Sequence, residues 1–296
     1  MFHVEHLKNQ LNLNNPKELY KDLEPLLNCI DYTVSKESYE VMYNQTYDLL
    51  VTSPVPSNLD KYYQSELYIS HTDSKKTLFD KIYQLVKNYS LKKKLKLINS
   101  FNTQEKDILD IGAGTGDFLK TCVNDNWNIT GVEPSKKART IALEKDINLE
   151  EKLTDIENKK FDVITLWHVL EHVPNLFEYI EVLKELLKPN GKLIIAVPNY
   201  KSYDAIYYKE HWAAFDVPRH LWHFSKKSIQ KIFSQYGFQL ENILPMKFDS
   251  YYVSLLSEKY KTGKSNPIKA FYLGFKSNLK AKKTKEYSSH IYILKK

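Results

Sequence analysis

A glycine-rich segment in the middle of the chain has the residue types and spacing of a ligand-binding loop. It reads Asp110-Ile111-Gly112-Ala113-Gly114-Thr115-Gly116-Asp117. The chain has only eight glycines in 296 residues, and three of them fall in this one short window. Glycine is favoured where the backbone turns tightly or lies directly against a ligand. We therefore predict that a ligand contacts the backbone of Gly112, Ala113, Gly114 and Gly116.

Two classes of ligand compete for such a loop at a junction between a strand and a helix. A dinucleotide site requires the pattern G-x-G-x-x-G, with its diphosphate on the helix N-terminus. Here the third glycine comes one residue early, and the position of the expected glycine holds Asp117. Asp110 adds a second carboxylate. Two anions would repel a diphosphate but would favour a ligand with an ammonium or sulfonium group. S-adenosylmethionine carries both groups, and a dinucleotide oxidoreductase is disfavoured.

A second acidic residue follows the loop at the distance expected for a ribose contact. Glu133 ends the segment Gly131-Val132-Glu133, 21 residues after Gly112. An acidic residue there can accept hydrogen bonds from ribose hydroxyls. The alternative is an exposed residue at the end of a strand.

Two histidine clusters supply candidates for acid–base chemistry. Methyl transfer from a sulfonium needs alignment of donor and acceptor, and removal of a proton when the acceptor is a hydroxyl. A neutral imidazole can take that proton without a metal, and we predict none. We expect His168 or His220 to be the base, with residues 212–224 as a cover over the methyl group. Further candidates on the acceptor side are Glu171, His172, Trp212, Arg219 and His223. The alternative for the second cluster is a structural loop at the sheet edge.

Short apolar runs alternate with helical stretches from residue 106 onward, which is typical of a parallel sheet with helices on both faces. We predict strands at residues 108–111, 128–132, 148–153, 161–167, 192–197, 238–244 and 287–294. We predict helices at 75–101, 117–126, 135–145, 176–187 and 225–236. A turn is expected at Pro189-Asn190-Gly191. The expected division is an N-terminal extension over 1–60, lead-in helices over 61–105, and a core over 106–296 with a helical insertion at 249–286.

Three stretches resemble the class I S-adenosylmethionine-dependent methyltransferases, and more narrowly the branch that includes the ubiquinone-biosynthesis O-methyltransferases. They are residues 107–119, 131–134 and 161–173, and residues 187–193 are similar to the start of the family's fifth strand. The resemblance implies an α/β, Rossmann-like, seven-stranded sheet whose last strand is antiparallel, with S-adenosylmethionine as cofactor. It further implies that Asp155 approaches the adenine, the alternative being a plain loop carboxylate. Trp167 is expected where the fourth strand opens onto the cofactor, the alternative being core packing.

Two departures from related patterns bear on the acceptor and on the N-terminus. Amino-group methyltransferases carry an Asn/Asp-Pro-Pro-aromatic motif after the fourth strand, where this chain has Trp167-His168-Val169-Leu170. This favours an oxygen or carbon acceptor.

Relatives often begin with a small zinc-ribbon-like module, whereas Cys29 stands alone here. We therefore interpret residues 1–60 as a degenerate, metal-free module.

Composition limits the remaining classes of function. The net charge is +7 and 42% of residues are hydrophobic, which is ordinary for a globular protein. No apolar run approaches the roughly 18 residues of a membrane helix. Residues 1–10 show no signal peptide. The two cysteines, Cys29 and Cys122, exclude a disulfide-rich module. We therefore expect a cytoplasmic protein. A small-molecule acceptor is the first hypothesis. The alternatives are an RNA methyltransferase, with lysine-rich helices on the phosphates, and a non-catalytic cofactor-binding protein; the oligomeric state is left open.

Overall fold

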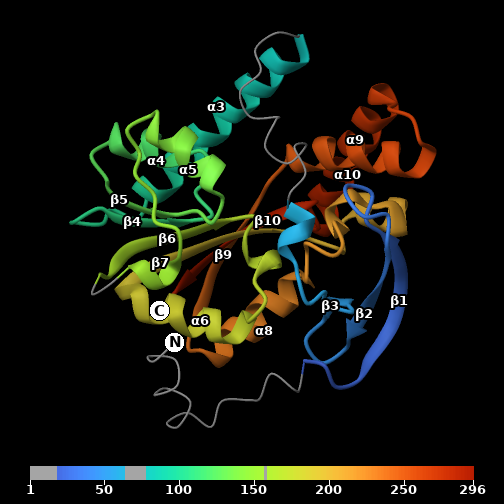
Figure 1. The fold of residues 1–296 in the computed structure, drawn as a ribbon, viewed down its shortest axis with the longest axis horizontal. Coiled ribbons are helices and arrows are strands. Elements are labelled where there is room, and N and C mark those ends of the chain that lie inside the picture. Colours follow the sequence, from blue (N-terminus) through green and yellow to red (C-terminus); the bar gives the residue numbers. More distant parts are fainter. Residues whose placement is uncertain (1–18, 64–77, 157–158) are drawn as a thin grey trace.

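The computed structural model describes residues 19–63, 78–156 and 159–296. Its centre is a six-stranded sheet with the order β5-β4-β6-β7-β10-β9 (Figure 1). The strands are β4 (Asp107–Ile111), β5 (Asn128–Val132), β6 (Phe161–Trp167), β7 (Leu187–Pro198), β9 (Gln239–Pro245) and β10 (Ser289–Lys295). The first four are parallel, and β10 runs antiparallel to both β7 and β9. The mostly parallel sheet with an antiparallel last strand confirms the predicted α/β fold class.

Helices cover both faces of this sheet (Figure 1). On one face lie α3 (Leu78–Asn99), α4 (Asp117–Val123) and α5 (Lys136–Leu143), and on the other lie α6 (Leu176–Leu186) and α8 (Lys226–Gln235). Alternate residues of each strand point to opposite faces. Ile164 of β6 accordingly packs in the core that contains α6 and α8, whereas Val163 packs in the core with α3 and α4. The sheet thus holds two separate apolar layers.

The prediction of seven strands is wrong by one. Residues 148–153, expected as the third strand, form only an isolated bridge between Val132 and Glu150. The local reason is composition, because this segment places Leu149 inward among charged neighbours and then turns into a short 3-10 helix, Leu153–Asp155. The predicted turn at Pro189-Asn190-Gly191 is a bulge within β7, where the register with β6 shifts.

The N-terminal region forms a second sheet that includes a strand of the core. Strands β1 (Leu23–Ile30), β2 (Ser38–Asn44) and β3 (Leu49–Ser53) are antiparallel, and β3 pairs with β8 (Trp222–His223) from the second histidine cluster. The expectations for residues 1–18, including the missing signal peptide, and for residues 64–77 lie outside the described residues. The division into domains stays a prediction.

A helical hairpin fills the segment before the last strand. It consists of α9 (Asp249–Thr262) and α10 (Pro267–Thr284), which contact each other and α7 (Tyr203–Tyr208) at one end of the molecule (Figure 1). Among the described residues, no helix has the length and apolar character needed to cross a membrane. Three short 3-10 helices, Leu170–His172, Lys209–His211 and Ala213–Phe215, connect the strand ends near the histidine clusters.

Candidate active site

The glycine loop turns away from β4 with three residues in the left-handed region. Gly112, Gly114 and Gly116 have φ values of 69°, 55° and 74°. The backbone N–H groups of Gly112 and Ala113 donate to the carbonyl of Val132, which ties the loop to the end of β5. A Cβ at Gly112 would lie 2.4 Å from Cγ2 of Val169, but one at Gly114 would meet no described atom within 4 Å. Packing therefore requires Gly112, whereas Gly114 borders open space where a ligand can reach the backbone.

Glu133 joins the loop to the next strand end. Its Oε2 accepts from the backbone N–H of Gly114 at 2.9 Å, and its Oε1 accepts from Ser135 at 2.8 Å. Arg139 supports the same corner by donating to the Glu133 and Pro134 carbonyls and to Glu151. The carboxylate thus lies beside the backbone that borders the open space, and its contact with a ribose stays a prediction.

Asp110 lies buried at the carboxyl end of β4. Its Oδ1 accepts from the hydroxyl of Thr165 on β6 at 2.6 Å. Burial raises the pKa of Asp110 to about 6. At neutral pH the group is therefore mainly a carboxylate, within the electrostatic reach of a ligand that carries positive charge.

Asp117 does not act as the free anion that the sequence argument assumed. Lys87 and Lys145 lie 2.8 Å and 2.9 Å from its carboxylate oxygens. Burial alone would raise the pKa of Asp117, but the hydrogen bonds from these lysines lower it. Because two cations neutralise Asp117, its charge no longer argues against a diphosphate. The electrostatic preference at the loop depends instead on Asp110 and Glu133.

Lys94 is a site residue that the sequence argument missed. It extends from α3, and its Nζ lies 4.1 Å from the centre of a Trp167 ring. Burial lowers the pKa of Lys94 to about 8, although Asp110 and Asp249 partly offset that effect. The signal was present, since Lys87, Leu91 and Lys94 share one face of the helix at helical spacing. Trp167 is half-buried, and its indole N–H has no partner among the described residues.

Asp155 has a local role in this structure. Its Oδ2 accepts from the backbone N–H of Lys152 at 3.0 Å, which caps the short 3-10 helix that contains it. A contact with adenine stays a prediction.

His168 lies between two carboxylates. Its Nδ1 is 3.3 Å from Oε1 of Glu171, and its Nε2 is 3.1 Å from Oδ2 of Asp249 at the start of α9. Burial would lower the pKa of His168, but hydrogen bonds and charges from Asp249 and Glu171 raise it to about 10. At neutral pH both ring nitrogens therefore carry protons, so His168 acts here as a cationic donor. In this arrangement it cannot accept a proton.

His172 and His220 retain lone pairs that can accept protons. The Nδ1 of His220 is 2.9 Å from the carbonyl of Ala214, and the Nδ1 of His172 is 3.1 Å from the carbonyl of Arg219. A carbonyl only accepts, so we assign a proton to Nδ1 of His220, whereas Nδ1 of His172 is also 3.1 Å from the hydroxyl of Tyr63, which can either donate or accept. In the neutral tautomer of His220, Nε2 then carries a free lone pair. Burial lowers the pKa of His172 to about 4, so at neutral pH this ring is uncharged.

Glu171 lies beside these two rings and completes a group that could hold a metal ion. One ligand atom from each of Glu171, His172 and His220 lies within 4.8 Å of the others. Burial would raise the pKa of Glu171, but His168 lowers it to about 2, so the group is ionised. Its Oε2 has no hydrogen-bond partner among the described residues. Imidazole nitrogen and carboxylate oxygen are common zinc ligands.

A second group of possible metal ligands lies where β4 and β6 begin, and a lysine side chain already balances its charge. It consists of Glu105, Asp107 and Asp162. The ammonium of Lys188 contacts all three, at 2.5 Å from Asp107 and 3.1 Å from Asp162. Lys188 therefore balances these carboxylates.

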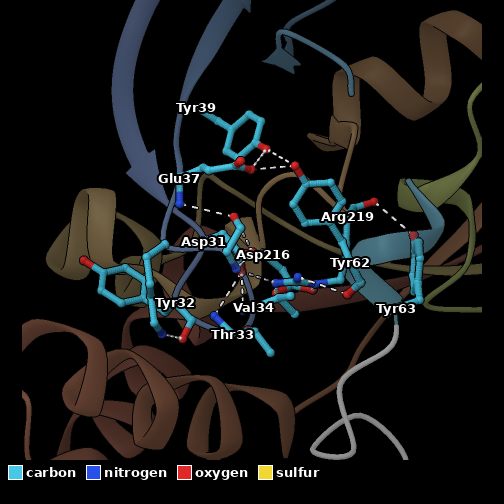
Figure 2. Close-up of polar contacts among 12 residues, drawn as sticks. Asp31, Tyr32, Thr33, Val34, Glu37, Tyr39, Tyr62, Tyr63, Asp216 and Arg219 are labelled. Atoms are coloured by element: carbon cyan, nitrogen blue, oxygen red, sulfur yellow. Dashed lines mark hydrogen bonds and ion pairs between the residues drawn. The ribbon is translucent and has the colours of Figure 1, made fainter. Parts of the chain in front are cut away.

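Arg219 is a structural residue, which corrects the expectation that it faces an acceptor. Figure 2 shows its guanidinium enclosed between Asp31, Asp216 and Tyr62. It bonds both oxygens of Asp216, at 2.9 Å and 2.6 Å, and Asp31 at 3.0 Å. Asp31 and Arg219 are both fully buried. This ion-paired group fixes the segment next to His220 to the N-terminal sheet.

Trp212 and His223 are also buried against protein partners. The indole N–H of Trp212 donates to Asp204, and the ring packs in the core of the N-terminal sheet. The Nε2 of His223 lies 3.0 Å from the hydroxyl of Thr52, which in turn donates to the His220 carbonyl. Burial lowers the pKa of His223 to about 3. Both side chains are therefore occupied by protein partners, which corrects the expectation that they face an acceptor. Residues 212–224 pack against the N-terminal sheet and hold His220 there.

Comparisons with known proteins identify the family of this chain. The family model of the methyltransferase domain matches residues 74–243. A ubiquinone biosynthesis O-methyltransferase from Actinobacillus pleuropneumoniae is 35% identical over 108 residues, which cover 32% of this chain and 46% of that protein. The corresponding protein from Yersinia pestis is 31% identical over 105 residues, covering 32% of this chain and 43% of the relative. The chain thus spans about half the length of the curated relatives that it matches.

The fold is shared with a solved methyltransferase. Magnesium protoporphyrin IX methyltransferase from Synechocystis PCC 6803, solved with bound SAH, aligns with a TM-score of 0.51 at 16% identity, over 76% of this chain and 90% of that chain. Because the family model covers more than half of the chain, including the glycine loop and the first histidine cluster, the assignment does not depend on the fold alone. This chain belongs to the methyltransferase domain family, whose S-adenosylmethionine-dependent members its sequence motifs resemble.

Proposed function

We propose that this protein transfers the methyl group of S-adenosylmethionine to a small-molecule acceptor, at an oxygen or carbon atom. The observation that carries the proposal is the open space beside Gly114, next to the Glu133 carboxylate. Asp110 lies buried at the end of the same strand. Such a site fits a ligand with ribose hydroxyls and a positive charge. When bound, S-adenosylmethionine supplies an electrophilic methyl group.

The residues of the glycine loop would hold this cofactor. Glu133 would accept from the ribose hydroxyls with the lone pairs that its two backbone donors leave free. The backbone of Gly112, Ala113, Gly114 and Gly116 would line one side of the ligand, and Asp110 would offset positive charge. Trp167 provides an aromatic wall whose indole N–H has no partner among the described residues.

His220 is the best-supported base for an acceptor hydroxyl. Its Nδ1 proton is directed to the Ala214 carbonyl, which leaves Nε2 to take the proton, and the ionised Glu171 beside it would stabilise the resulting imidazolium. His172, whose ring is uncharged at neutral pH, is the second candidate. Both N–H groups of His168 are directed to Asp249 and Glu171, so His168 would act on the acceptor through its positive charge.

The test combines binding with product identification. Calorimetry should detect binding of S-adenosylmethionine and S-adenosylhomocysteine, and none of NAD. The protein is then incubated with small-molecule cell extract and methyl-labelled donor, and labelled products are identified by mass spectrometry, with Gly114→Val as the inactive control. Binding of NAD in place of the donor would contradict the proposal. Binding without any labelled product would favour a non-catalytic role.

A further inference from the structure

Helix α10 carries its large apolar residues on the outside. The residues on its inner face, against α7 and α9, are mostly small: Ala270, Leu273, Gly274, Ser277 and Ala281 are all buried. Small inner residues allow the helices to pack closely. They leave the large side chains of α10 without a place in the core.

The outer face of α10 forms a continuous apolar stripe. Ile268 is 85% exposed, Phe271 64%, Tyr272 58%, Phe275 47% and Leu279 45%. These positions recur at intervals of three and four residues, so they share one face of the helix. We call these five residues the α10 stripe. A stripe of this size is unusual on a surface that faces only water.

Positive charge is concentrated around the α10 stripe. Residues 259–285 contain nine lysines and no aspartate or glutamate, whereas the whole chain has a net charge of +7. Lys280, Lys282 and Lys283 are exposed at the C-terminal end of the helix. The rest of the chain therefore carries a small net negative charge, and the basic character of the protein resides in this segment.

An open groove adjoins the stripe and shares Phe275 and Leu279 with it. Its volume is about 240 Å³, and its walls include Phe248, Tyr251, Phe275 and Leu279, with Lys247 and Lys282 also lining it. The next residue along the chain from Phe248 is Asp249, which contacts His168. The groove thus includes Phe248, the residue next to the one that contacts His168.

We propose that the α10 stripe and its lysines dock on an anionic lipid bilayer. An amphipathic helix with aromatic and aliphatic residues on one side and lysines beside them binds in the interface of a membrane, with the lysines close to anionic headgroups. The groove, with apolar walls and two lysines, fits the same lipid chemistry. This inference goes beyond methyl transfer and does not depend on it.

Two other occupants fit the observations less well. A second copy bound through the same face would bring two lysine-rich segments together and cause repulsion. Single-stranded RNA is held by stacking of bases on aromatic rings, to which Ile268 and Leu279 would add nothing. The combination of aliphatic and aromatic side chains with unbalanced positive charge favours lipid.

The test measures co-sedimentation of the full-length protein with vesicles. We expect binding to phosphatidylcholine vesicles containing 30% phosphatidylglycerol, at least tenfold weaker binding to phosphatidylcholine alone, and release by salt. The charge variant Lys280→Gln/Lys282→Gln/Lys283→Gln should weaken binding on the order of 100-fold, given about 1 kcal/mol for each lysine near an anionic surface. The apolar variant Phe271→Ser/Phe275→Ser should weaken it at least tenfold.

A matched control replaces exposed leucines elsewhere. Leu85→Ser/Leu143→Ser, at side chains 69% and 62% exposed, should bind vesicles like the wild type. Equal binding to both kinds of vesicle, or binding unchanged in the α10 variants, would overturn the proposal. So would retention on single-stranded RNA without vesicle binding, or a dimer lost in the apolar variant without vesicle binding. Calorimetry with S-adenosylhomocysteine on each variant separates failure of docking from failure of the proposed function.

Discussion

Replacement of Arg219 by methionine tests whether the N-terminal sheet positions the proposed base. The change removes two bonds to Asp216, one to Asp31 and one, at 3.4 Å, to the carbonyl of Tyr62. Removing one partner of a buried ion pair costs about 3–5 kcal/mol, because the remaining charge is left uncompensated.

The structure places the expected loss at the lower end of that range. Asp31 would keep its hydrogen bonds from Thr33, Val34 and Ser35, and the side chain of Asp216 is 18% exposed. We therefore expect Arg219→Met to lower the free energy of unfolding by about 3 kcal/mol. Because His220 follows Arg219 directly, turnover should also fall, whereas affinity for S-adenosylhomocysteine should change little.

Denaturant unfolding and calorimetry measure the two effects. The chain offers a matched control, since Arg139 is its other arginine. Arg139 pairs with Glu151, whose side chain is 53% exposed, so Arg139→Met should cost only about 1 kcal/mol and should act on donor binding through Glu133. Equal losses in the two variants, or a loss below about 1 kcal/mol for Arg219→Met, would refute the assignment of Arg219 to the support of His220.

Four further outcomes follow from the site. Glu133→Ala should weaken donor binding by about 1.5–3 kcal/mol in calorimetry, the range for hydrogen bonds to a charged group, and unchanged affinity would contradict the ribose assignment. Gly114→Val should abolish donor binding while circular dichroism stays native, because a branched side chain would enter the open space at a φ of 55°. Once an acceptor is known, His220→Ala should lower turnover about 10²–10⁴-fold at saturating donor, and His168→Gln by less; the reverse order would exclude His220 as the base. Finally, Asp249 and Glu171 raise the pKa of His168 from 6.5 to about 10 in the folded protein. The ion pairs of the protonated ring therefore stabilise the fold fully below pH 6.5, and this stabilisation is lost as the pH rises towards 10. Relative to His168→Gln, the wild type should lose about 1 kcal/mol over that interval, a small value because the imidazole is 37% exposed.

The parts of the structure that sequence reasoning predicted well depend on local patterns. The glycine loop, the strands around it and the position of Glu133 follow from residues that are neighbours along the chain. Residues 148–153 have only a weak apolar pattern, and the strand predicted there is an isolated bridge in the structure, which is why the predicted number of strands was one too high.

The parts that sequence reasoning missed depend on partners far away in the chain. Arg219 has the residue type of an anion-binding group, but its partner Asp31 lies 188 residues away. His168 was interpreted as a base because Asp249, the carboxylate that keeps it protonated, lies on a helix assigned only to an insertion. A titratable side chain can be located from the sequence, but its protonation state depends on such distant groups.

The sheet shared between β3 and β8 has a consequence for the order in which the protein can fold during synthesis. β3 ends at Ser53 and its partner β8 begins at Trp222, so about 170 residues separate the two strands. At about 5–20 residues per second, the ribosome needs roughly 10–30 seconds to supply the missing strand. During that interval the β3 edge of the newly made three-stranded N-terminal sheet is open to pairing with other chains. The nascent protein should therefore depend on chaperones until the segment that carries His220 emerges and closes the sheet.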